Sequence, residues 1–134
     1  VLAVSSLYGI DLLADNVHEC RQRLFDIFEQ NYAIRFKAKC FDECKNSVKY
    51  ILANNILQGD ALTLQSGDQP IVFPEWSFVN GTQLKRRDFT FHVLLEKSGV
   101  DDLPLFSDEN DPAFIPEPIK EYPPIHFLKL GQDA

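Results

Sequence analysis

Two carboxylates, Asp11 and Asp60, each follow a short apolar run that has the composition of a buried strand. Asp11 ends the sequence Tyr8-Gly9-Ile10-Asp11. In doubly wound nucleotide-binding folds, a carboxylate at a strand end accepts hydrogen bonds from ribose hydroxyls. Two hydroxyls and one bidentate carboxylate match in geometry and charge. Asp11 is therefore a candidate ribose ligand, and an acidic residue that simply opens a loop is the alternative.

Asp60 lies in the sequence NILQGDAL, residues 55–62. Gly59 allows a sharp turn or a close approach of the backbone to a ligand. Ligands of open α/β sheets bind at the carboxyl ends of the strands. A carboxylate at this position can accept a hydrogen bond from an exocyclic amine, and the next backbone N–H, that of Ala61, can donate to a ring nitrogen.

The elements that position these residues follow from the pattern of apolar side chains. Residues 4–13 and 55–62 are predicted to form strands, the first of them buried on both faces of a sheet. Between them we expect helices over about residues 16–31, with Asp15 as N-cap, and 34–53. The order strand, helix, helix, strand favours an α/β sheet with parallel strands. The expected apolar stripes are Val17, Cys20, Leu24, Ile27, Phe28 and Asn31 in the first helix, and Phe36, Cys40, Cys44, Val48 and Ile51 or Leu52 in the second.

Composition changes near residue 70, because all eight prolines lie at or after Pro70. Residues 70–79 are β-prone, but Pro70 and Pro74 argue against a regular central strand there. Residues 89–95 fit either a strand or the start of a helix. We expect residues 96–134 to be extended and laid on a surface. Their expected anchors are Phe106, Phe114, Ile115, Tyr122, Ile125, Phe127 and Leu128.

These features divide the chain into a strand–helix–helix–strand unit, residues 1–69, and a proline-rich, acidic extension, residues 70–134, packed on the same domain. The stretch YGIDLLADNVHECRQRLFDIF, followed by NILQGDALTL, resembles the S-adenosylmethionine-binding part of N6-adenine DNA methyltransferases. The likeness is to the methyltransferase subunits of type IIG and type I-like restriction–modification systems. The later stretches PIVFPEWSFVNG, KRRDFTF and IPEPIKEYPPIHFLKL resemble segments of such proteins more loosely.

The resemblance implies a partial class I methyltransferase-like (Rossmann-like) α/β fold, with a parallel sheet, two crossover helices and the proline-rich C-terminal extension. It implies S-adenosylmethionine as cofactor. Asp11 would hold the ribose, and Leu12 would pack near the adenine ring. Asp60 would face the adenine amino group, with Ala61 supplying a backbone contact.

Two parts of the family pattern are missing. No glycine-rich loop precedes Leu7, and no Asn/Asp-Pro-Pro-Tyr/Phe signature follows the Gly-Asp strand. The one Pro-Pro pair, Pro123-Pro124, lies between Tyr122 and Ile125 and lacks the polar side chain that accepts from a target amine. We therefore assign no catalytic residue. We expect a fragment or subunit that contributes to cofactor binding without transferring a methyl group alone, and that meets DNA through the complete enzyme.

The alternative is a non-enzymatic interaction module derived from a methyltransferase, paired with a second copy or with a complementing methyltransferase chain. A third idea concerns the only basic run of three, Lys85-Arg86-Arg87, which could contact nucleic-acid phosphates. Nearby Trp76, Phe78 and Phe89 would supply surfaces for base stacking. A solvated basic turn that pairs with the acidic tail explains the same run. The formal net charge of −7 argues against a chain that binds nucleic acid on its own.

The three cysteines, an odd number between Cys20 and Cys44, favour a reduced, cytoplasmic setting over a disulfide framework. Core packing is the expected role of Cys20, Cys40 and Cys44, and no metal site is expected because no second ligand pair at zinc spacing accompanies them. No apolar run approaches the roughly 18–20 residues that span a bilayer, and no signal peptide is recognisable.

Overall fold

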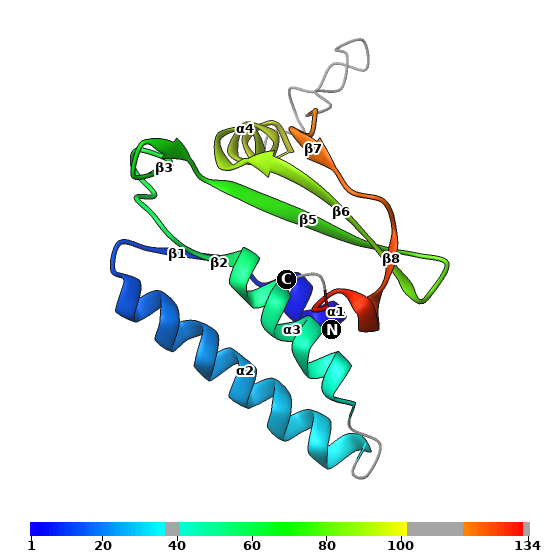
Figure 1. Ribbon diagram of the computed structural model, residues 1–134. Helices are drawn as coiled ribbons and strands as arrows, with labels where there is room; N and C mark the ends of the chain where they lie inside the picture. Colours follow the sequence, from blue (N-terminus) through cyan, green and yellow to red (C-terminus); the bar gives the residue numbers. More distant parts are fainter. Residues whose placement is uncertain (37–40, 102–116, 133–134) are drawn as a thin grey trace.

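The computed structural model in Figure 1 describes residues 1–36, 41–101 and 117–132. These residues form a mixed α/β structure that contains a parallel sheet of two strands. The elements in chain order are α1 (Leu2–Ser5), β1 (Gly9–Asp11), α2 (Ala14–Phe36), α3 (Asp42–Asn55), β2 (Ile56–Gln58), β3 (Gln65–Ser66), β4 (Gln69–Pro70), β5 (Val72–Val79), β6 (Gln83–Thr90), α4 (Phe91–Asp101), β7 (Lys120–Glu121), β8 (Ile125–His126) and the 3-10 helix η3 (Phe127–Lys129).

Strands β1 and β2 pair in parallel, with Gly9 opposite Ile56 and Asp11 opposite Gln58, and both α2 and α3 lie between them in the chain. The predicted parallel pairing is therefore confirmed. The predicted extents are wrong, because each strand has three residues and Val4 belongs to helix α1. Burial on both faces is also wrong for this segment, since side chains on either side of β1 are exposed, among them Leu7, Tyr8, Leu12 and Leu13.

Helix α2 starts earlier and runs further than predicted, since it takes in residues 34–36, and α3 begins only at Asp42. Asp15 lies inside the first turn of α2 and is not its N-cap. Of the stripe expected on α2, Val17 is buried but Cys20, Ile27 and Asn31 are exposed. The reason is that α3 and the short sheet contact one side of α2 and leave the opposite side open (Figure 1).

Helix α3 buries most of the stripe expected of it, because Cys44, Val48, Ile51 and Leu52 are all at most 6% exposed. Phe36, expected in the same stripe, belongs to α2 and is exposed, and Cys40 lies outside the described residues. Val48, Ile51 and Leu52 join a core to which α1, α2, β2, β6 and the segment after η3 each contribute. The buried members are Val4, Val17, Phe25, Val48, Ile51, Leu52, Ile56, Leu84 and Leu130. This core therefore includes residues from both the N-terminal unit and the extension.

The β5–β6 hairpin is the largest sheet element, with Trp76 opposite Arg86 and Pro74 opposite Asp88. Strands β7 and β8 both pair with the other edge of β6, so β5 is an edge strand of the described sheet. Pro74 is tolerated because an edge strand does not need every backbone N–H for pairing. Helix α4 lies on the side of the hairpin away from α3 (Figure 1).

Both alternatives for residues 89–95 occur, since Phe89 and Thr90 are the last two residues of strand β6 and Phe91 begins α4. The expected tail anchors Tyr122, Ile125, Phe127 and Leu128 are half-buried. Ser47, which is fully buried in α3, donates a hydrogen bond from its hydroxyl to the backbone oxygen of Phe127. The anchors Phe106, Phe114 and Ile115 lie outside the described residues.

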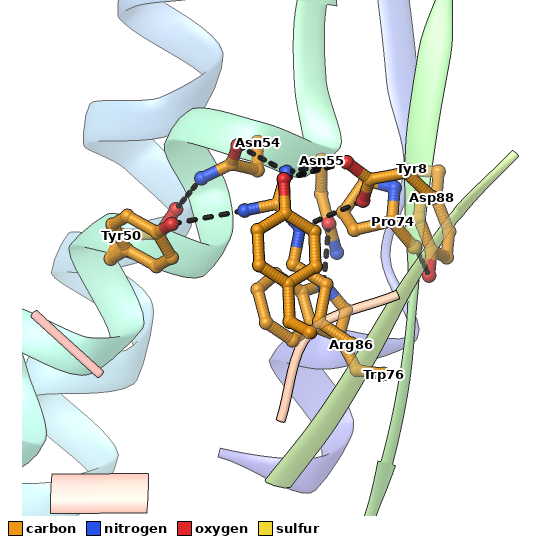
Figure 2. Close-up of polar contacts among 9 residues, drawn as sticks. Tyr8, Tyr50, Asn54, Asn55, Pro74, Trp76, Arg86 and Asp88 are labelled. Carbon is orange, nitrogen blue, oxygen red and sulfur yellow. Dashed lines mark hydrogen bonds and ion pairs between the residues drawn. The ribbon is translucent and has the colours of Figure 1, made fainter. Parts of the chain in front are cut away.

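A polar network joins the hairpin to α3 (Figure 2). The Arg86 guanidinium donates to both carboxylate oxygens of Asp88, at 2.8 and 3.2 Å, to the Tyr50 hydroxyl at 2.9 Å and to Asn54 Oδ1 at 3.2 Å. It also lies over the Tyr122 ring, 4.5 Å from the centroid. Since the side chains of Arg86 and Asp88 are only 14% and 8% exposed, the charges compensate each other away from water.

Replacing Arg86 by methionine is expected to lower the free energy of unfolding by about 3–5 kcal/mol, because the nearly buried Asp88 carboxylate loses its charged partner. Urea denaturation followed by circular dichroism measures the change. Arg87→Gln is the matched control. It removes a half-exposed ion pair with Glu75 and should cost about 1 kcal/mol or less. Equal losses in the two variants would contradict the role given to Arg86.

Candidate functional site

The two candidate carboxylates lie together at the carboxyl end of the parallel sheet. Asp11 is the last residue of β1, and Asp60 comes two residues after the end of β2. The backbone N–H of Gly59 donates to the backbone oxygen of Asp11 at 2.9 Å, so the two strand ends are joined directly. Both acidic residues are partly exposed.

Asp11 is fixed by the loop that follows it. Its Oδ1 accepts hydrogen bonds from the backbone N–H of Leu13 at 2.8 Å and from Asn16 Nδ2 at 3.2 Å. These contacts close the turn into α2, which is the role that the sequence suggested for Asp15. Oδ2 has no hydrogen-bond partner among the described residues. The carboxylate is thus oriented through one oxygen and leaves the other available to a ligand.

Asp60 repeats this arrangement on the neighbouring strand. Its Oδ1 accepts from the backbone N–H groups of Leu62 at 2.8 Å and Thr63 at 3.4 Å. Its own backbone forms a bridge with Gln65, and the backbone N–H of Leu64 donates to the Asp60 backbone oxygen at 2.8 Å. Within the described part of the chain, Asp60 Oδ2 and the backbone N–H of Ala61 have no hydrogen-bond partner. A carboxylate acceptor and an adjacent amide donor are therefore free on one turn.

Two exposed leucines flank the carboxylates. The side chain of Leu12 is 64% exposed and that of Leu62 is 94% exposed. Gln58 Nε2 donates to the backbone oxygen of Leu12 at 3.1 Å and so ties the first loop to β2. The tight turn puts Leu64 in the left-handed region, at φ 61°, which is costly for a residue with a Cβ. Sequence reasoning selected Leu12 but missed Leu62, whose exposure depends on this turn.

Gly59 is required by close packing. A Cβ at this position would lie 2.7 Å from Ile71 Cδ1 and 3.2 Å from the backbone oxygen of Gln65. Ile71 is only 2% exposed, and its side chain covers the Gly59 backbone. The glycine of the Gly-Asp pair thus serves packing within the chain.

Tyr8 connects the start of β1 to the hairpin. Its hydroxyl donates to the backbone oxygen of Pro74 at 2.6 Å, and its ring meets Phe73 edge-on at 5.3 Å. Partial burial, followed by the nearby Glu75 carboxylate, raises the pKa of Tyr8 above its ordinary value. The hydroxyl therefore stays protonated and keeps donating at neutral and moderately alkaline pH.

The basic run lies on strand β6, away from the strand-end carboxylates. Arg86 is engaged in the inward network, and Arg87 pairs with Glu75 and lies over the Phe89 ring. The Glu75 partner raises the pKa of Arg87 further. Lys85 makes no hydrogen bond or ion pair within the described residues. Of the three cations proposed for phosphate contact, Lys85 alone has an uncommitted charge.

The cysteines do not come together. Cys44 is buried in α3, which confirms its predicted core role, whereas Cys20 is exposed on α2 and its predicted core role is wrong. Cys40 lies outside the described residues. In the part of the chain that the structure describes, no three His, Cys, Asp or Glu side chains are grouped so as to hold a metal ion.

No helix in the described ranges combines the length and the apolar character needed to cross a membrane. Comparison of the chain with protein-family models, curated proteins and solved structures finds no match.

Substituting Gly59 by alanine is expected to cost about 1–3 kcal/mol of stability, because the added methyl group must displace Ile71. Chemical denaturation of the single and double variants provides the test. In an Ile71→Val background the nearest clashing atom is absent, so the same substitution should cost less. An equal cost in both backgrounds would show that the Gly59–Ile71 contact is not the constraint.

Proposed function

We propose that this chain supplies the nucleoside-binding edge of an S-adenosylmethionine site in an N6-adenine DNA methyltransferase, as a fragment or subunit without its own catalytic motif. The paired strand ends carry the proposal: Asp11 and Asp60 follow adjacent parallel strands, and each keeps one carboxylate oxygen unpaired among the described residues. The resemblance of both stretches to that family supports the same assignment. The proposed setting is a class I methyltransferase-like sheet in a cytoplasmic enzyme.

The chemistry divides between the two strand ends. Asp11 Oδ2 accepts from the ribose hydroxyls, and the exposed Leu12 side chain covers one face of the adenine ring. Asp60 Oδ2 accepts from the adenine 6-amino group, while the free N–H of Ala61 donates to a ring nitrogen. The Asp60 acceptor and the Ala61 donor together match the Watson–Crick edge of adenine. Hypoxanthine, the base of inosine, lacks the amino donor that Asp60 would accept from.

The chain alone has a modest site. The family's glycine-rich loop, which holds the methionine part of the cofactor, has no counterpart among these residues, so binding energy is limited to the nucleoside portion. Asp11 and Asp60 would orient the adenosine group. Transfer of the methyl group to DNA, and contact with DNA, would belong to the complete enzyme.

Adenosine is expected to bind the chain weakly, with a Kd of about 1 mM. Titration followed by ¹⁵N–¹H correlation spectra should shift the amides of residues 11–13 and 59–63. Asp60→Asn should abolish the preference for adenosine over inosine, which we expect to be about tenfold. Asp11→Asn should instead abolish the preference for adenosine over 2′-deoxyadenosine.

Asp15→Asn is the matched control, because Asp15 is exposed in the first turn of α2 and its carboxylate is not assigned to the ligand. It should leave both preferences unchanged. Thermal unfolding of each variant checks that the turns remain formed. Adenosine binding that is unaffected when Asp11 and Asp60 are both changed, or shifts confined to other residues, would refute the assignment.

A second candidate function, a self-association module, is favoured by one observation on α2. Exposed side chains recur there at intervals of seven residues: Leu13, which immediately precedes the helix, and Cys20, Ile27 and Ile34 within it. Such spacing forms a stripe suited to a second helix. A second copy running antiparallel would place Leu13 against Ile34 and Cys20 against Ile27, because the stripe is symmetric about its midpoint.

Sedimentation equilibrium is expected to detect a dimer that Ile27→Glu converts to a monomer, because a carboxylate would be placed within the apolar stripe. Gln22→Glu adds the same charge on the opposite side of α2 and should leave the dimer intact. A monomeric chain at all concentrations, or equal dissociation in both variants, would rule out association through this stripe.

A further inference from the structure

A cavity of about 690 Å³ lies at the opposite end of α2 from the strand-end carboxylates. It is lined by the last turns of α2, the start of α3, helix α1, the turn between β5 and β6, and η3, and it is open to solvent on one side. Helix α2 begins at Ala14, shortly after Asp11, and the first of its residues to line the cavity is Phe28, so about 21 Å of helix separates the two places. The volume falls in the range of small-molecule sites, and the location is independent of the proposed nucleoside edge.

Aromatic rings dominate the walls of this cavity. Phe28 and Tyr32 stack with centroids 5.3 Å apart and planes 18° apart, and Phe36 follows at 5.2 Å from Tyr32. Across the cavity, Phe78 and Phe127 meet edge-on at 6.4 Å. The rings on α2 therefore face a second aromatic pair that belongs to the hairpin and the tail. Flat apolar molecules gain most from such walls, since offset stacking and edge-on contacts add to burial.

One charged side chain, Arg35, lines the cavity. It makes no ion pair within the described part of the chain, unlike Arg23, which pairs with Glu19 on the exposed side of the same helix. The amide side chain of Asn31 also lines the cavity, and its Nδ2 is committed to the backbone oxygen of Ile27. The Arg35 guanidinium is thus the charged side chain of this lining, and Val1, which carries the α-amino group, lines the cavity as well; both groups favour an anion.

We propose that this cavity binds a small organic anion with a flat aromatic body, of the aryl carboxylate or aryl sulfonate class. The aromatic body packs between the α2 rings and the Phe78–Phe127 pair, and the anionic group pairs with Arg35. Buried Cys44 lines the same cavity, so a bound molecule shields its thiol. The inference stands apart from the nucleoside site, because neither Asp11 nor Asp60 takes part.

The test uses two fluorescent probes with the 134-residue chain. 8-Anilinonaphthalene-1-sulfonate carries the anion, whereas N-phenyl-1-naphthylamine has the same aromatic body without a charge. We expect the sulfonate to saturate one site, and Arg35→Gln to weaken it by about tenfold while leaving the neutral probe unchanged. Arg23→Gln, on the same helix but outside the cavity, should affect neither probe.

Two further measurements locate the probe. Ala3→Phe, which places a ring in the cavity from helix α1, should abolish binding of both probes. In a Cys20→Ser, Cys40→Ser chain, the sulfonate should slow alkylation of Cys44 by N-ethylmaleimide. In a Cys40→Ser, Cys44→Ser chain, the sulfonate should leave the rate of alkylation of exposed Cys20 unchanged. Non-saturable fluorescence, insensitivity to Ala3→Phe, or an equal loss of both probes in Arg35→Gln would overturn the proposal.

Discussion

Helix α3 becomes strand β2 between Asn55 and Ile56 with no connecting residue, and the remaining structure depends on how this junction is satisfied. The last carbonyl groups of a helix lack intrahelical partners. The Arg21 side chain of α2 supplies them, donating to the backbone oxygens of Ala53 at 3.1 Å and Ile56 at 2.6 and 2.9 Å. Fully buried Asn55 accepts from Trp76 Nε1 at 2.8 Å (Figure 2). It also donates to the Ser5 backbone oxygen at 3.3 Å.

This junction links α1, α2 and the hairpin to the same few residues. Because Arg21 and Asn55 fix the beginning of β2, they also fix where the strand ends three residues later. The position of Gly59 under Ile71 and its hydrogen bond to Asp11 follow from that register. The polar contacts of Arg21 and Asn55 lie at the start of β2, and the candidate site follows its other end. Because β2 is so short, these contacts hold the site in place although the sheet itself is small.

Local patterns in the sequence predicted the parallel pairing of the strands, the part of the apolar stripe that lies on α3, and the location of Asp11 and Asp60 at neighbouring strand ends. They failed where the outcome depended on contacts between distant segments. The stripe predicted on α2 contains both Ile27 and Val17, but only Val17 packs in the core with α3 and β2. Periodicity alone could not distinguish the covered face of this helix from its exposed face. Arg86 appeared as part of a basic run. Its inward direction is set by strand alternation and by Asp88, Tyr50 and Tyr122, which sequence spacing does not bring together.

The end of the described chain packs into the centre of the molecule. Leu130 belongs to the core with Val4 and Val48, and Gly131 lies against the backbone of Asn46, where a Cβ would approach within 2.8 Å. Ser47 and Phe127 are joined across 80 residues of sequence. Contacts this far apart form slowly, because a long loop must close before they contribute. During synthesis, α3 therefore emerges well before Phe127, Leu130 and Gly131, and the part of α3 that these residues contact stays uncovered until they have been made.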